Sequence, residues 1–119
     1  MKLSKHFSKS EFECKCGCGE EFEVDKELLI LLDNIREMIG TPITVTSGYR
    51  CKKHNDSVGS NERSQHRKGT AADLVVDEVP PTVIANIAEY LLLESGGIGR
   101  YETFTHVDVR DGSARWGKN

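Results

Sequence analysis

The sequence places a carboxylate in the middle of an apolar segment. Asp73 lies within TAADLVV, where its neighbours are alanine, leucine and valine, as in a buried strand. Burying an ionised carboxylate is costly unless the group is paired or bound to a cation. Any fold of this chain must therefore bring a metal ion or a positively charged side chain to Asp73.

Two segments have the apolar periodicity of amphipathic helices. Leucine and isoleucine recur at spacings of three and four over residues 25–40, between a candidate N-cap aspartate and a glycine stop. The second helix is expected from the Pro-Pro pair through about residue 94. A capping-box spacing also predicts a short helical turn over residues 8–12.

Strand signals alternate with these helices. ITVTSGYR alternates β-branched residues and then breaks at Ser-Gly, TAADLVV has strand character, and residues 98–110 predict one or two strands. Residues 51–69 are polar and are expected to form a long loop. The order predicts an α+β fold with a small, mostly antiparallel sheet flanked by helices, in a single domain over residues 1–119.

Charge and hydropathy exclude two classes of partner. The formal net charge is −3 and no long run of Lys or Arg occurs, so we expect no nucleic-acid partner. The most apolar run, residues 84–93, is much shorter than the roughly 20 residues of a membrane span, so no membrane partner is expected. We expect a monomer.

Three residues have the chemistry of a catalytic zinc site. His66, Asp73 and His106 supply the three nitrogen and oxygen ligands that such a site needs, with one position left open. Asp108 follows His106 by two residues in TFTHVDV, so both project from one strand face. Asp108 could take a proton from bound water or could orient the imidazole. Without a metal, Asp73 could pair with an arginine, His106 could be an ordinary strand histidine, and Asp108 could pair with Arg110.

Three stretches resemble the signature blocks of a known family. SGYRC, SQHRKGTAADL and FTHVDVR are similar to blocks of the zinc D-Ala-D-Ala carboxypeptidase family of peptidoglycan peptidases, especially its small single-domain phage and bacterial members. The resemblance extends over about residues 3–116. It implies Zn²⁺ bound by His66, Asp73 and His106 on a scaffold similar to that of hedgehog proteins and DD-peptidases.

The resemblance also implies roles for other residues. The arginine of SGYR, here Arg50, is expected to bind a substrate carboxylate or to stabilise an oxyanion, which suits a fixed, always charged guanidinium. Many members have an acidic base three residues before the last histidine, where this chain has Thr103. Asp108 and Glu102 are the alternatives, and we favour Asp108 because it shares a face with His106.

The implied activity is zinc-dependent hydrolysis of a peptide bond in a peptidoglycan stem peptide or cross-link, as a carboxypeptidase or an endopeptidase. The alternative is a non-catalytic zinc domain that binds cell wall or a protein partner, since hedgehog signalling domains resemble the same scaffold. The N-terminal MKLSKHFSKSEFE lacks the apolar segment of a signal peptide. Synthesis in the cytoplasm, with phage-type or other release to the cell wall, is therefore expected.

Four cysteines remain outside this scheme. Cys14, Cys16 and Cys18 lie in ECKCGCGEEF, and Cys51 directly follows the SGYR block. They could hold a second metal, form disulfides or stay free, and their spacing alone does not decide among these. A cysteine nucleophile at Cys51, with His54 near it, lacks a third orienting residue.

Overall fold

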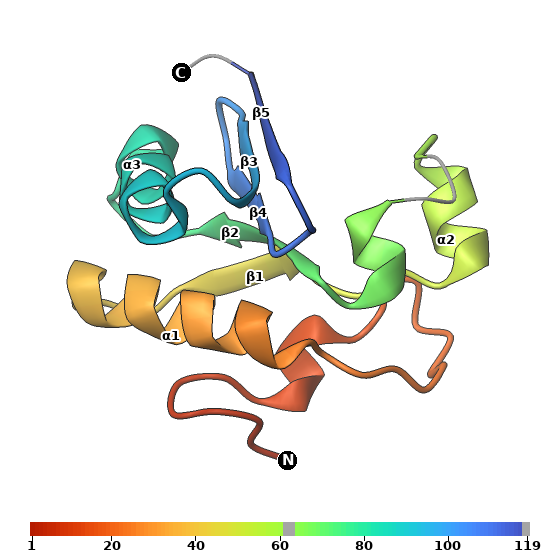
Figure 1. The fold of residues 1–119 in the computed structure, drawn as a ribbon. Helices are drawn as coiled ribbons and strands as arrows, with labels where there is room; N and C mark the ends of the chain where they lie inside the picture. Colours follow the sequence, from red (N-terminus) through yellow and green to blue (C-terminus); the bar gives the residue numbers. More distant parts are fainter. Residues whose placement is uncertain (61–63, 118–119) are drawn as a thin grey trace.

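The computed structural model describes residues 1–60 and 64–117 (Figure 1). Residues 61–63, which belong to the expected loop, and residues 118–119 of the expected domain lie outside the described residues. Within the described part, helices surround one small sheet (Figure 1). No helix in residues 1–60 or 64–117 combines the length and the apolar character needed to cross a membrane.

The sheet has five strands in the order β1-β2-β4-β3-β5. All neighbouring pairs are antiparallel except β3 and β5, which are parallel. This confirms the prediction of an α+β fold with a mostly antiparallel sheet. The strands are β1 (Thr44–Ser47), β2 (Ala71–Val75), β3 (Gly96–Arg100), β4 (Thr105–Asp108) and β5 (Ser113–Gly117).

Both expected amphipathic helices are present, as α1 (Lys26–Ile39) and α3 (Pro81–Leu92). Asp25 caps α1 by accepting a hydrogen bond from the Glu27 amide, and Gly40 ends the helix in the left-handed conformation that glycine tolerates. The expected turn over residues 8–12 is the 3₁₀ helix η1 (Lys9–Phe12), which begins with the capping box of Ser8 and Glu11. For these three helices the signals in the local sequence were sufficient.

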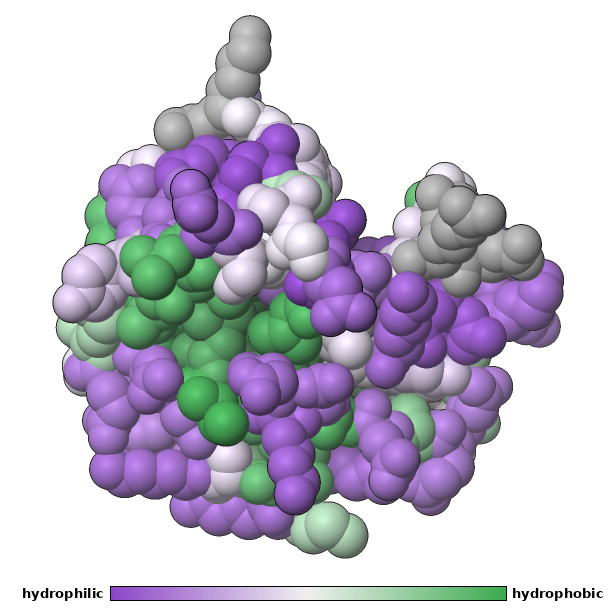
Figure 2. All heavy atoms as spheres, in the orientation of Figure 1, coloured by the Kyte–Doolittle hydropathy of each residue, from purple (hydrophilic) through white to green (hydrophobic). Residues whose placement is uncertain are grey.

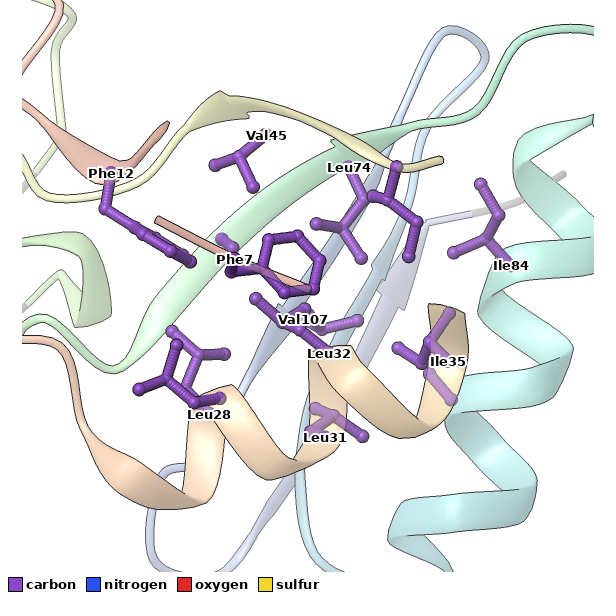
Figure 3. Close-up of a cluster of buried hydrophobic side chains, with 14 of the residues drawn as sticks. Phe7, Phe12, Leu28, Leu31, Leu32, Ile35, Val45, Leu74, Ile84 and Val107 are labelled. Carbon is purple, nitrogen blue, oxygen red and sulfur yellow. The ribbon is translucent and has the colours of Figure 1, made fainter. Parts of the chain in front are cut away.

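A buried apolar cluster joins α1, α3, the sheet and the N-terminal segment (Figure 3). Leucines of α1 point toward the strands, and α3 closes one side (Figure 3). Apolar surface gathers where α1 and α3 meet, whereas most of the rest of this face is hydrophilic (Figure 2). The largest apolar side chains with almost no exposed surface are Phe7, Phe12, Leu28, Leu32, Ile35, Leu74, Ile84, Ile98 and Val107.

The prediction of one long loop over residues 51–69 was wrong. The segment contains the helix α2 (Lys52–Ser57) and the 3₁₀ helix η2 (Gln65–Lys68). Helix α2 was hidden because it buries only Asn55 and therefore shows no apolar stripe. Its N-cap is a thiol, that of Cys51, which accepts from the His54 amide, and cysteine is not among the usual capping residues. Strand β5 was also missed.

A substitution in the core measures how much the fold depends on this cluster. Leu32 is fully buried in α1, so Leu32→Ala should lower the free energy of unfolding by about 2–5 kcal/mol through lost burial and a residual cavity. Ile30→Ala in the same helix is the control, because Ile30 is 56% exposed and its loss should change stability by about 0.5 kcal/mol or less. Urea unfolding followed by circular dichroism measures both. Equal losses would contradict the assigned core face of α1.

Candidate functional site

The register between β2 and β4 sets two polar side chains beside each other. Asp73 pairs with His106, while the flanking residues Leu74 and Val107 contribute to the apolar cluster. Because side chains alternate across a strand, Asp73 and His106 both lie on the face opposite the core. The carboxylate that the sequence places in an apolar strand thus meets an imidazole directly across the sheet.

His66 approaches the same point from η2. The Ser64 hydroxyl accepts a hydrogen bond from the His66 amide at 3.2 Å and caps the short helix. Gly69 ends it with φ +73°, where an added Cβ would lie 2.0 Å from the Glu23 carbonyl oxygen. The tight turn therefore requires glycine and returns the chain into β2 within four residues of Asp73.

The ligand atoms of the three predicted metal-binding residues converge. Asp73 Oδ1 lies 3.3 Å from His66 Nε2 and 3.0 Å from His106 Nδ1. One donor atom from each residue lies within 4.8 Å of the others, and all three residues are buried. Two imidazole nitrogens and a carboxylate oxygen facing one point form a possible metal site.

The second nitrogen of each imidazole is held from behind. His66 Nδ1 donates to the Gly48 carbonyl oxygen at 2.7 Å, which leaves Nε2 facing Asp73. His106 Nε2 donates to Asp108 Oδ2 at 2.7 Å, which leaves Nδ1 facing Asp73. Outer partners of this kind fix the ring orientation and the tautomer of metal-binding histidines.

Asp108 accepts hydrogen bonds from two neighbouring side chains. Its carboxylate accepts from His106 on one side and from Arg110 Nε and Nη2 on the other, at 2.8 and 2.7 Å. Burial would raise the pKa of Asp108, but the hydrogen bonds from Arg110 and His106 outweigh it and hold this pKa well below its usual range. Gly97 provides the space, since a Cβ there would lie 2.3 Å from Asp108 Oδ2. The pairing of Asp108 with Arg110, which the sequence offered as the alternative without a metal, is present together with the contact to His106.

The electrostatics of the site favour a positive charge beside Asp73. Burial alone would raise the pKa of Asp73, but the hydrogen bonds from His106 and His66 lower it to about 2. Burial would lower the pKa of His106, and the hydrogen bonds to Asp108 and Asp73 outweigh this and raise it. While His106 is protonated it donates to both carboxylates, and a metal ion at Nδ1 would take the place of one proton.

His66, Asp73 and His106 line an open cleft of about 390 Å³. Figure 2 shows a hollow between the body that carries the sheet and the lobe that carries α2. Arg50 lines the cleft, with its Nη2 3.7 Å from Asp73 Oδ2, so the structure brings it to the predicted ligands. The other lining residues that the structure describes are Ser60, Ser64, Gln65, Tyr101, Phe104, Arg110 and Trp116.

An aromatic wall of the cleft was missed from the sequence. The ring of Trp116, in β5, lies 5.0 Å from that of His106, and its indole donates to the Tyr101 hydroxyl at 2.8 Å. Gly99 on the neighbouring strand leaves room for it, because a Cβ there would lie 2.6 Å from the indole ring. The available signal was that this is the chain's single tryptophan, following a glycine turn close to the last predicted strand.

The remaining predicted residues lie at the edge of the site. Thr103 and Glu102 are both exposed in the turn between β3 and β4, and neither lines the cleft. Glu102 is nevertheless flanked in sequence by Tyr101 and by the segment leading to Phe104, which do line it.

Comparison with known proteins agrees with this geometry. The sequence profile of the peptidase M15 family matches residues 5–108. The chain is 29% identical over 99 residues to proteins named peptidoglycan L,D-endopeptidase MepK from Escherichia coli K12 and from Shigella flexneri. Each alignment covers 77% of this chain and 53% of the relative, so the chain spans about half the length of the curated relatives it matches. The chain belongs to the peptidase M15 family of metallopeptidases.

Proposed function

We propose that this chain is a zinc-dependent peptidase that hydrolyses a peptide bond of bacterial peptidoglycan. The observation that carries the proposal is the convergence of His66, Asp73 and His106 on one point at the floor of an open cleft. The similarity to MepK, named a peptidoglycan L,D-endopeptidase, supports peptidoglycan as the substrate and an endopeptidase as the type of enzyme.

The donor set fits zinc. Two neutral imidazoles and one carboxylate match the three protein ligands of catalytic zinc sites, and His66, Asp73 and His106 would hold the ion. When bound, the ion would polarise the scissile carbonyl and lower the pKa of its water to about 7. The cleft above it gives a peptide access to this point.

Arg50 is placed to act on the substrate. Its guanidinium is mostly buried, with 16% of the side chain exposed, and lies beside Asp73 at the cleft floor. The Ser47 hydroxyl accepts from its Nε at 3.3 Å, which restrains the side chain. A fixed guanidinium in this position can bind a substrate carboxylate or stabilise the oxyanion that develops during hydrolysis.

Asp108 is proposed as a positioning residue rather than the proton acceptor. It contacts Nε2 of His106, whereas the ligand atom of that ring is Nδ1, so Asp108 lies behind the ring. Both of its oxygens already accept hydrogen bonds, and the residue has no exposed surface. Of the two carboxylates proposed from the sequence, Glu102 is then the remaining candidate base, in an exposed turn whose residues Tyr101 and Phe104 line the cleft.

Digestion of purified peptidoglycan tests the activity. The zinc-loaded protein should release new peptide fragments, and a chelator should stop their release until zinc is restored. Mass analysis identifies the bond: cleavage within stems or bridges means an endopeptidase, and loss of a terminal D-Ala means a carboxypeptidase. If zinc-loaded protein leaves the peptidoglycan fragments unchanged, the peptidase hypothesis is rejected and the alternative of a non-catalytic zinc-binding domain is retained.

The ligand assignment predicts a matched pair of variants. Asp73→Asn removes the charge that faces both imidazoles, so metal affinity and peptidoglycan hydrolysis should both fall by at least about 10–100-fold. Asp77→Asn makes the same change at an exposed residue just beyond the C-terminal end of β2 and should retain both. Metal titration and fragment analysis measure the two effects. Full zinc binding at this site in Asp73→Asn would contradict the assignment.

The zinc affinity of two variants distinguishes the two candidate bases. Asp108→Asn should weaken zinc binding by about 10–100-fold, because the amide orients His106 poorly. Glu102→Gln should bind zinc normally but lower kcat by about 10²–10⁴-fold if its carboxylate takes the proton. A zinc titration gives the affinity of each variant, and kcat is then measured at saturating zinc, so that the two roles can be distinguished. Normal zinc affinity with lost kcat in Asp108→Asn would return the base role to Asp108.

A further inference from the structure

Four thiols from two segments that are far apart in the sequence meet next to the SGYR block. Cys14, Cys16 and Cys18 follow η1, and Cys51 lies 37 residues after Cys14, immediately before α2. All four sulfur atoms lie within 4.8 Å of one another. The fold therefore gathers every cysteine of the chain into one cluster, which the sequence had left as one of several alternatives.

The distances between the sulfur atoms fit a single tetrahedral ion. Cys14 Sγ lies 3.3 Å from Cys16 Sγ and 3.6 Å from Cys51 Sγ, and Cys16 Sγ is also 3.6 Å from Cys51 Sγ. A zinc ion with bonds of about 2.3 Å to four thiolates separates them by about 3.8 Å. A disulfide would require about 2.05 Å, and all four thiols are free.

Backbone amides point at the sulfur atoms, as expected around thiolates. The amide of Cys51 donates to Cys14 Sγ, that of His54 to Cys51 Sγ, and that of Glu20 to Cys18 Sγ, each at 3.4 Å. Hydrogen bonds to a charged sulfur stabilise the deprotonated form that binds metals. Three such contacts from separate parts of the chain indicate a site built to hold negative sulfur.

We propose that Cys14, Cys16, Cys18 and Cys51 bind a structural zinc ion, separate from the ion proposed at His66, Asp73 and His106. Four thiolates complete a tetrahedron and leave no position for water or substrate, which is typical of structural rather than catalytic zinc. Soft sulfur ligands in this geometry select zinc or a single iron over magnesium or calcium. The close approach of the sulfur atoms leaves no room for an iron–sulfur cluster between them.

The ion would fasten the N-terminal segment behind the proposed active site. The Tyr49 amide donates to the Phe12 carbonyl oxygen at 2.9 Å, and a Cβ on Gly48 would lie 2.7 Å from Phe12 Cα. The two segments thus already pack backbone to backbone, and zinc at Cys14 and Cys51 would lock this contact. Small domains without disulfides commonly gain stability from such metal sites.

Metal counting tests the proposal without an activity assay. Protein purified under reducing conditions with zinc should contain two zinc ions per chain by elemental analysis. Cobalt exchanged into the protein should give the sulfur-to-metal charge-transfer absorption of a thiolate site, and X-ray absorption should show zinc–sulfur distances of about 2.3 Å. One zinc per chain without sulfur ligands would overturn the proposal, and one iron in place of zinc would overturn the choice of metal.

Two variants separate this ion from the proposed catalytic one. The double substitution Cys16→Ser and Cys18→Ser changes only exposed thiols, so the apolar core is left intact, and it should remove the sulfur-bound ion alone. Asp73→Asn should do the reverse and keep the thiolate absorption. The double variant should also melt at a lower temperature than the parent. If it retains two zinc ions, or if the parent's mass reveals disulfides in place of the metal, the proposal fails whatever the outcome for peptidoglycan hydrolysis.

Discussion

The buried carboxylate of Asp73 is the constraint on which the rest of the structure depends. It can stay ionised inside the sheet because two imidazoles and the Arg50 guanidinium face it. The imidazoles reach it through the β2–β4 register and the turn at η2. Leu74 and Val107 enter the core through the same register. A slip of one residue would send the charged side chains into the core and the apolar ones into the cleft. Core packing and site assembly are therefore set by one choice of strand pairing.

A second layer of charge makes this arrangement stable. His106 lies between two carboxylates, and Arg110 neutralises the outer one, Asp108, with two hydrogen bonds from its guanidinium. The buried groups thus alternate in sign from Asp73 outward, so each charge has a partner at hydrogen-bond distance. Gly97 is needed for this arrangement of charges, because any side chain there would occupy the space of the Asp108 carboxylate. A strand residue without a side chain is what allows an aspartate to be buried behind the imidazole.

The sequence predicted what local patterns encode and missed what only three-dimensional neighbours create. Helix α1 has an apolar stripe and both caps, so its bounds were predictable, whereas α2 is polar and capped by a thiol. Strand alternation placed Asp108 on the face of His106, but it could not show which ring nitrogen Asp108 contacts, and that contact decides its role. Trp116 joined the cleft through the parallel pairing of β5 with β3, a contact that no short-range pattern specifies.

The segment between β1 and α2 connects the two proposed metal sites. Within four residues it supplies the Gly48 carbonyl that fixes His66, the Arg50 guanidinium in the cleft, and the Cys51 thiol of the sulfur cluster. Groups that hold a reacting molecule must be placed to within about 0.5 Å, which a short irregular segment does not achieve unaided. The sulfur cluster anchors it at one end and the β-sheet at the other. A structural ion in a chain of 119 residues would therefore act on catalysis indirectly, by limiting the motion of the residues that orient the first ion and its substrate.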